Sequence, residues 1–319
     1  MKKKPFVYNN IAFLVLGTSM AILISFFIPA KKSLTEAEAN LNFPGKERVT
    51  ASLFRHTDSP ERGSLPDLVA SSALVVDPLI QETLFAKREG DLVPIASLTK
   101  IMTALIALER SHKDERILIS EQAVGTEGIS GNLSVGETHS VSSLISMMML
   151  ESSNDAAVAL AEHVGRVYGA ETFEESQTLF TNLMNEKATA LGMSSAHFQN
   201  PSGLDLTDDV PSNLSSARDL ANLITYVSQF PGIWNPSQNE SVVLLDSGIE
   251  HPLFNINEIA RETPGLIGSK TGFTDRAGGS LVAFIEIPLG QPKILVILGS
   301  TQEARFEDMR ALIHWLQAQ

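Results

Sequence analysis

The sequence predicts an α+β domain in which an antiparallel sheet has flanking helices and a helical lobe. Three observations lead to this prediction: two short β-prone runs open the folded part, apolar residues at helical spacing fill the middle, and four apolar runs precede one closing amphipathic segment. Because successive strands with short connections pair antiparallel, we expect the early hairpin and the final helix to pack on the late sheet.

The first half of the domain begins with a hairpin. Its strands are expected at 72–77 and 83–87, followed by a helix over about 97–110, a Gly- and Ser-rich loop at 125–136, and a buried helix at 141–150. Three methionines in that buried helix are expected to fill the core. A polar tripeptide, 152–154, separates it from a helix that starts at Asp155 and runs to about residue 168.

The second half continues with helices before it turns to strands. Helices are expected over 170–191 and 216–230, with a turn at 200–204 between them. Strands are then expected at 242–245, 268–273, 279–285 and 293–299, before a closing helix over about 303–317. No internal repeat is present.

Composition narrows the classes of function. The 319 residues are 43% hydrophobic and 19% charged, which suits a folded core, and the formal charge of −13 argues against a nucleic-acid partner. With no cysteine there is no disulfide, cysteine-ligated metal or thiol nucleophile. The seven histidines form no HExxH-type pattern, so the sequence predicts neither a metal site nor a cofactor.

The N-terminus contains a candidate membrane segment. Residues 11–29 are an apolar run of about 19 residues behind three lysines, long enough for a helix that crosses a bilayer. A cleaved signal peptide is the alternative, but 26–32 lacks a small-x-small cleavage site. We therefore expect residues 1–32 to be a cytoplasmic tail and single-pass signal-anchor, 33–66 a flexible linker, and 67–319 a folded domain outside the cell membrane.

Three short motifs combine side chains that suit nucleophilic catalysis. Ser97 at a helix start ordinarily reads as an N-cap, yet Lys100 shares its helix face and can reach the hydroxyl as a base. The second motif, Ser152-Ser153-Asn154, either is a simple interhelical turn or presents its first and third side chains to a cleft. Lys270-Thr271-Gly272 is the third.

Such a set, in this order, is typical of β-lactamases and penicillin-binding proteins. With the surrounding sequence, residues 70–317 closely resemble the D-alanyl-D-alanine carboxypeptidase family of low-molecular-mass penicillin-binding proteins, serine peptidase family S11. The segments that carry the resemblance are 94–100, 154–157, 191–193, 200–204, 216–219, 270–274 and 305–306. The resemblance implies a β-lactamase/DD-peptidase-like fold on the cell-wall side of the membrane, with peptidoglycan stem peptides as substrates and β-lactams as covalent inhibitors.

The resemblance also implies roles for the catalytic residues. Ser97 would be the nucleophile that is acylated by the penultimate D-alanine of a stem pentapeptide, and Lys100 would be its base. Burial and the second ammonium of Lys270 favour a neutral Lys100. Ser152 resembles the proton relay to the leaving D-alanine, and Asn154 resembles the amide that holds Lys100 and the substrate backbone.

The expected binding residues lie late in the chain. Lys270, Thr271 and Arg305 resemble the groups that receive the substrate's terminal carboxylate. Gly272 lets the substrate backbone come close, and the backbone N–H groups of Phe273 and of the nucleophile are expected to form the oxyanion hole.

Two features depart from the family pattern. Ser153 replaces a common glycine, which can narrow the cleft but removes no chemical group. Only 47 residues follow Gly272, so we expect no C-terminal β-domain, and the N-terminal segment would do the anchoring.

Carboxypeptidase activity is favoured, and a DD-endopeptidase that cuts crosslinks is the main alternative. A β-lactamase would need a Glu-x-x-x-Asn element that Glu186 does not provide, and an inactive peptidoglycan-binding protein would have lost a motif residue.

Overall fold

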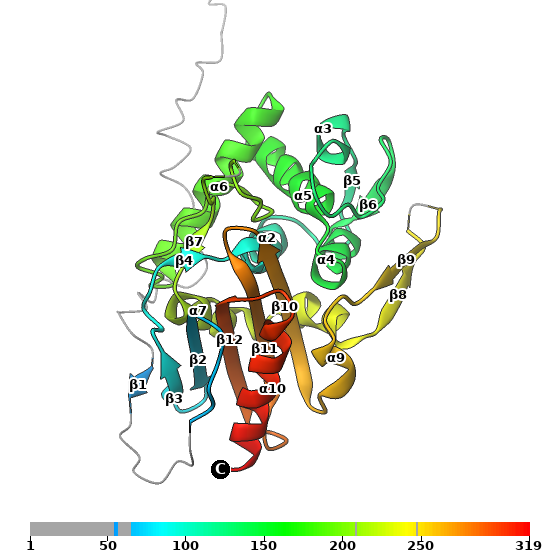
Figure 1. Ribbon diagram of the computed structural model, residues 1–319. Coiled ribbons are helices and arrows are strands. Elements are labelled where there is room, and N and C mark those ends of the chain that lie inside the picture. Colours follow the sequence, from blue (N-terminus) through cyan, green and yellow to red (C-terminus); the bar gives the residue numbers. More distant parts are fainter. Residues whose placement is uncertain (1–53, 57–64, 208, 247) are drawn as a thin grey trace, which may run out of the picture. The chain divides into compact units, whose positions relative to one another are not determined.

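The computed structural model describes residues 54–56, 65–207, 209–246 and 248–319. Their central element is a six-stranded sheet with the strand order β1-β3-β2-β12-β11-β10 (Figure 1). Only β1 and β3 pair in parallel, and every other neighbouring pair in this sheet is antiparallel. The strands are β1 Arg55–His56, β2 Ser72–Asp77, β3 Glu82–Lys87, β10 Leu266–Thr274, β11 Gly278–Glu286 and β12 Pro292–Ser300. The predicted hairpin therefore joins the sheet directly through β2 and β12.

Helices cover both faces of this sheet. The closing helix α10, Ala304–Gln317, packs on β11 and β12, and α7, Ala217–Val227, packs on β12 and β2. Leu281 and Leu295 lie in the core beneath α10 with Met309. The residues next to them along their strands, which point to the opposite face, are buried as well. Because both faces are covered, β11 and β12 are continuous apolar runs without alternation.

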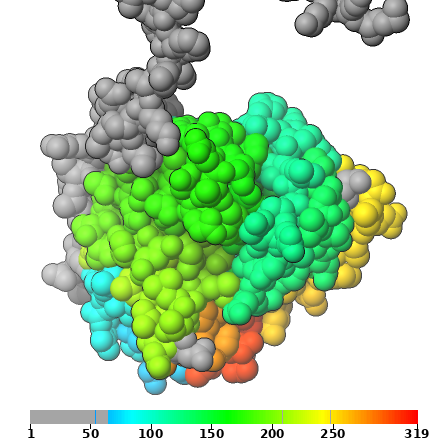
Figure 2. All heavy atoms as spheres, turned by 90° about the horizontal axis from the view of Figure 1, so that it is seen from above, coloured from blue at the N-terminus to red at the C-terminus, as the bar shows by residue number. Residues whose placement is uncertain are grey.

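A helical lobe lies beside the sheet and is built around α2, Thr99–Arg110. This helix contacts α4 (Val141–Leu150), α5 (Asn154–Val167), α6 (Phe173–Ala190) and α7. Its first nine residues are all buried, which explains its apolar sequence. The predicted helices are confirmed, and the three methionines of α4 lie in the core. Viewed from above, this lobe covers most of the visible face (Figure 2).

Short elements complete the domain. They are the strand pairs β4 Val93–Pro94 with β7 Leu214–Ser215, β5 Arg116–Leu118 with β6 Thr138–Ser140, and β8 Ser241–Leu244 with β9 His251–Phe254, the helices α3 Glu121–Val124, α8 Pro231–Trp234 and α9 Ile259–Glu262, and the 3-10 turns η1 Ala96–Leu98 and η2 Asn235–Gln238.

One strand pairing and one helix end differ from the prediction. The run at 242–245 does not join the late sheet, because the chain folds back and pairs it with β9 as a separate hairpin. The helix predicted to reach residue 230 ends at Val227, since Phe230 precedes Pro231 and a residue before proline disfavours helical backbone.

The N-terminal predictions fall largely outside the described residues. The expected membrane segment, 11–29, lies entirely outside them, and in the part of the chain that the structure describes no helix is both long and apolar enough to cross a membrane. Arg55–His56, within the expected linker 33–66, forms strand β1 at the sheet edge, so regular structure begins earlier than expected.

Candidate active site

Ser97 lies where the sheet meets the helical lobe. It occupies the 3-10 turn η1 immediately before α2, between the buried side chains of Ala96 and Leu98, and is itself partly exposed. The first turn of α2 has no side-chain cap, so Ser97 does not serve as the N-cap that its position suggests. Its hydroxyl is therefore available to the neighbouring cleft.

The amine of Lys100 is in hydrogen-bond contact with that hydroxyl. Its Nζ lies 2.8 Å from Ser97 Oγ, 2.7 Å from Asn154 Oδ1 and 2.7 Å from the backbone oxygen of Ser202. The orientation of the Asn154 amide is fixed, because its Nδ2 donates to the Glu127 carbonyl at 2.9 Å. The i,i+3 spacing thus produces the predicted contact between Ser97 and Lys100. Two carbonyl oxygens are the other hydrogen-bond partners of the amine.

This environment favours a lysine that can accept a proton. Complete burial lowers the pKa of Lys100 to about 7, although the nearby charge of Asp155 raises it. A neutral amine has two N–H groups and one lone pair. The two carbonyl acceptors cannot donate, so they take both N–H groups, and the lone pair is left for the only partner with a proton to give, the Ser97 hydroxyl.

Ser152 faces the same space from the turn between α4 and α5. Its backbone has a φ of +66°, a conformation that costs an L-residue roughly 1–3 kcal/mol, and its Oγ accepts a hydrogen bond of 2.9 Å from Lys270 Nζ. Burial, Lys100 and Arg305 all hold the pKa of Lys270 well below its ordinary value. A second weakly basic amine therefore stands behind this serine.

Ser153 does not narrow the cleft. It is fully buried and is the N-cap of α5, where its Oγ accepts a hydrogen bond of 3.0 Å from Ala156 N and donates to Asp155. Gly131 packs directly against it, since an added Cβ there would lie 2.8 Å from Ser153 Oγ. The Ser153 side chain points into the helical lobe, so the prediction that it can narrow the cleft is wrong.

Strand β10 forms the opposite wall as the outermost strand of the sheet. Its Gly272 lies close to the serine turn, because an added Cβ would be 3.0 Å from Ile95 O and 3.3 Å from Ser97 N. Thr271 and Phe273 both line the cleft, and Phe273 is half-exposed. The expected close approach of strand and nucleophile turn is thus present.

Arg305 enters this site from the first turn of α10. Its Nη1 donates to the Gly272 carbonyl at 2.8 Å, and its guanidinium lies 4.7 Å from the centre of the Phe306 ring. Burial lowers its pKa, although Glu303 and Glu258 raise it. Among the described residues no carboxylate lies within ion-pair distance of this buried cation, which leaves it able to receive one from a ligand.

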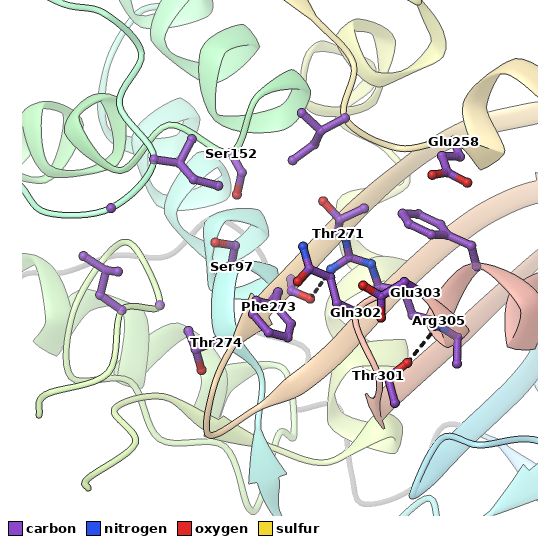
Figure 3. Close-up of a pocket in the computed structure, with 18 of the residues that line it drawn as sticks. Ser97, Ser152, Glu258, Thr271, Phe273, Thr274, Thr301, Gln302, Glu303 and Arg305 are labelled. Atoms are coloured by element: carbon purple, nitrogen blue, oxygen red, sulfur yellow. Dashed lines mark hydrogen bonds between the residues drawn. The ribbon is translucent and has the colours of Figure 1, made fainter. Parts of the chain in front are cut away.

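These walls enclose a cleft of about 920 Å³. Ser97 and Ser152 lie on one side of Thr271 and Phe273, and Arg305 lies on the other (Figure 3). The structure brings together all of the predicted site residues. Lys100 and Lys270 do not line the cleft, because both are buried behind the two serines, so the Lys270 amine contacts Ser152 instead of the open space where a carboxylate was expected.

Two residues of the site had no role predicted from the sequence motifs. Ser202 supplies a carbonyl to Lys100, and Gly203 has a φ of +86° with no room for a side chain, since an added Cβ would lie 2.0 Å from Ala96 O. The Asn-Pro-Ser-Gly turn was visible in the sequence, but its contact with the nucleophile turn depends on the tertiary fold.

Comparisons with known proteins agree with this geometry. Residues 59–302 match the family D-alanyl-D-alanine carboxypeptidase, peptidase S11. The chain is 30% identical over 267 residues to a D-alanyl-D-alanine endopeptidase of Pseudomonas aeruginosa, covering 81% of each protein. It is 32% identical over 225 residues to D-alanyl-D-alanine carboxypeptidase DacF of Bacillus subtilis, covering 67% of this chain and 53% of that one.

The fold is also shared with solved structures. Penicillin-binding protein D2 of Listeria monocytogenes, solved in an ampicillin-bound form, superposes with a TM-score of 0.68 at 29% identity, covering 79% of this chain and 99% of that one. The chain therefore belongs to the D-alanyl-D-alanine carboxypeptidase family, S11, of serine peptidases.

Proposed function

We propose that this protein is a serine D-Ala-D-Ala carboxypeptidase, which removes the terminal D-alanine of peptidoglycan stem pentapeptides through an acyl-enzyme on Ser97. The observation that carries the proposal is the buried amine of Lys100, 2.8 Å from Ser97 Oγ, with a pKa of about 7. An amine of this basicity is neutral in part at physiological pH and can act as a general base.

Acylation would begin with the proton of Ser97. Lys100 takes it while Oγ attacks the carbonyl carbon of the penultimate D-alanine, and the backbone N–H groups of Ser97 and Phe273 stabilise the oxyanion. The C–N bond then breaks as the Ser152 hydroxyl gives a proton to the leaving amine and recovers one from the protonated Lys100. In deacylation Lys100 takes a proton from the attacking water and returns it to Ser97 Oγ as the ester bond breaks, so both residues are restored. The 2.9 Å hydrogen bond from Lys270 holds the Ser152 hydroxyl in place for this relay.

Recognition of the substrate would use its terminal carboxylate. Arg305 has no carboxylate partner among the described residues and lines the cleft with Thr271, so a cation and a hydroxyl are present for one ligand group. Lys270 lies beneath the cleft, where its amine donates to Ser152 Oγ. Asn154, fixed between Lys100 and the Glu127 carbonyl, would position the base and meet the substrate backbone.

A DD-endopeptidase acting on crosslinks is the second candidate. The relative from Pseudomonas aeruginosa, matched over 81% of both chains, is named an endopeptidase. In a 4,3-crosslink the scissile bond also ends at a D-residue with a carboxylate, but the leaving amine is part of a second peptide. The cleft extends past Arg305 to Glu307 and Arg310, which would leave room for it.

One incubation distinguishes these activities. Purified protein is mixed with pentapeptide muropeptides and with crosslinked dimers, and the products are separated by chromatography. We expect tetrapeptides and free D-alanine from the first substrate. Dimers cut to monomers while pentapeptides persist would replace the carboxypeptidase assignment with the endopeptidase one.

We further propose that β-lactams acylate Ser97, and that the catalytic domain, 67–319, acts outside the cell membrane, held by 11–29 through the segment 33–66. The apolar length of 11–29 and the lysines before it support the anchor. Cell fractionation tests it: a chain without residues 1–32 should leave the membrane fraction, and its continued partitioning there would contradict the anchor.

A further inference from the structure

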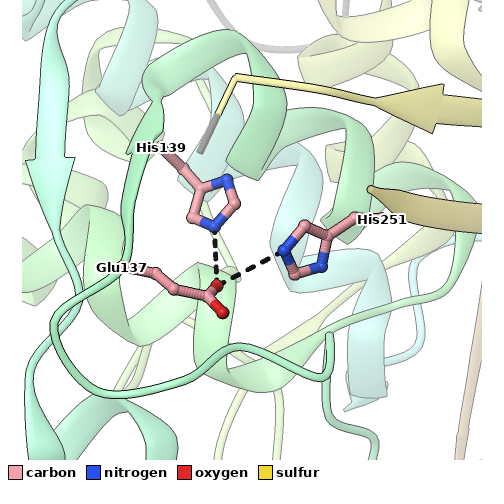
Figure 4. Close-up of side chains that lie close together, drawn as sticks. All are labelled: Glu137, His139 and His251. Atoms are coloured by element: carbon pink, nitrogen blue, oxygen red, sulfur yellow. Dashed lines mark hydrogen bonds and ion pairs between the residues drawn. The ribbon is translucent and has the colours of Figure 1, made fainter. Parts of the chain in front are cut away.

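A polar cluster lies away from the cleft, where the β8–β9 hairpin meets the helical lobe. Glu137 directly precedes β6, His139 lies within that strand, and His251 begins β9 (Figure 4). Their potential ligand atoms all lie within 4.8 Å of one another, and both histidines are more than nine-tenths buried. This cluster takes no part in the chemistry proposed for Ser97.

The distances from Glu137 to the two histidines fit a tetrahedral metal. Glu137 Oε2 lies 3.0 Å from His139 Nε2 and 3.4 Å from His251 Nε2. A zinc ion with bonds near 2.05 Å places its ligand atoms about 3.3 Å apart. Two imidazole nitrogens and one carboxylate oxygen are a donor set that zinc accepts readily.

The hydrogen bonds of the cluster are incomplete without a further partner. His251 Nε2 is buried and has no hydrogen-bond partner in the described residues, although it faces the Glu137 carboxylate. His139 lies between two carboxylates, with Nδ1 3.0 Å from Asp246 Oδ1 and Nε2 3.0 Å from Glu137. A neutral imidazole has one N–H for these two acceptors, so one nitrogen presents a lone pair to an anion. A cation between Glu137 and the two Nε2 atoms removes that conflict.

Asp246 has the position of an outer-shell carboxylate. It accepts hydrogen bonds from Ser140 N at 2.7 Å and Ser143 Oγ at 2.7 Å, and it pairs with Arg116 at 3.1 Å. These contacts fix the carboxylate against His139 Nδ1, which would set the tautomer that directs Nε2 toward a metal.

The cluster can be reached from solvent. Glu137 and His251 line a cavity of about 300 Å³ together with Glu151 and Glu250. An ion could therefore enter on the side where two of the three ligands are accessible, and the cavity has room for a water as the fourth ligand.

We propose that Glu137, His139 and His251 bind one zinc ion, with Asp246 orienting His139. The ion would join the β8–β9 hairpin to the N-terminal end of α4. At the end of β9, Phe254 N donates to Glu151 Oε1 at 2.9 Å, next to the turn that carries Ser152. This inference departs from the expectation of no metal site, which rested on the absence of a local HExxH pattern.

The test is zinc binding by the full chain. Protein treated with a chelator and dialysed is titrated with ZnCl₂ in a calorimeter, and the same sample is titrated with Co²⁺ while its visible absorption is recorded. We expect one zinc ion per chain and a d–d spectrum typical of tetrahedral cobalt with nitrogen and oxygen ligands. The absence of saturable binding by the wild-type chain would overturn the proposal.

Variants assign the ligands. His251→Gln should abolish saturable binding, and Asp246→Asn should weaken it by about 10- to 100-fold. His163→Gln is the matched control, because His163 also lies 3.0 Å from a glutamate, Glu115, but outside this cluster; its zinc affinity should equal that of the wild type. Penicillin labelling of each variant verifies folding. Equal affinity of folded His251→Gln and wild type would overturn the site, and the wild-type cobalt spectrum still decides the case if His251→Gln does not fold.

Discussion

The rate of Ser97 acylation should follow the protonation state of Lys100. Burial lowers the pKa of this lysine to about 7, and only the neutral amine can take the serine proton. Below that pKa each pH unit reduces the neutral fraction about tenfold, so about a tenth remains one unit below it. The acylation rate should therefore fall about tenfold per unit as pH drops below 7, and level off above about pH 8.

The assay is the second-order rate of labelling by a fluorescent penicillin, measured with the full chain between about pH 5 and 9. Thermal unfolding in the same buffers serves as the control for loss of structure. Lys100→Arg should be slower by about 10²- to 10⁴-fold near pH 8, because a guanidinium stays protonated, and its rate should lack the rise with pH that the wild type shows. A rate that is independent of pH, or normal labelling of folded Lys100→Arg, would remove Lys100 as the base.

Three further substitutions test other parts of the site. Arg305→Gln should lower kcat/KM for a carboxylate-ended peptide by about 10- to 100-fold but not for its amide, because a charged hydrogen bond contributes roughly 1.5–3 kcal/mol; equal losses on both would contradict carboxylate binding. Gly203→Ala should lower the free energy of unfolding in urea by at least about 2 kcal/mol, since its Cβ would lie 2.0 Å from Ala96 O, and a loss below about 0.5 kcal/mol would contradict this packing. Ser153→Ala should cost about 1 kcal/mol of stability as a lost cap and leave the labelling rate unchanged, whereas slower labelling of the folded variant would put Ser153 in the cleft.

Local spacing predicted the local part of the active site. Ser97 and Lys100 share a helix face, so their contact follows from helical geometry, and the structure confirms it at 2.8 Å. The acceptors that complete the lysine environment, Asn154 and the Ser202 carbonyl, come from other elements. Periodicity carries no information on which turns meet, and those contacts follow only from the packing of α2 against its neighbours.

Sequence patterns also do not indicate which strands pair or which buried polar side chains meet. The long apolar strands β11 and β12 were predicted because they are covered on both faces, whereas the four-residue β8 gave no sign of its partner. Glu137 and His139 stand two residues apart on one strand face, a weak signal for a ligand pair. His251 joins them only because the β8–β9 hairpin folds against the lobe.

The central claim is that Ser97 is the nucleophile. Its most direct test is the mass of the peptide that contains Ser97, after the full chain is incubated with benzylpenicillin and digested. We predict a penicilloyl adduct on Ser97 and no adduct anywhere on folded Ser97→Ala. An adduct at another residue, or unchanged labelling of Ser97→Ala, would contradict the account.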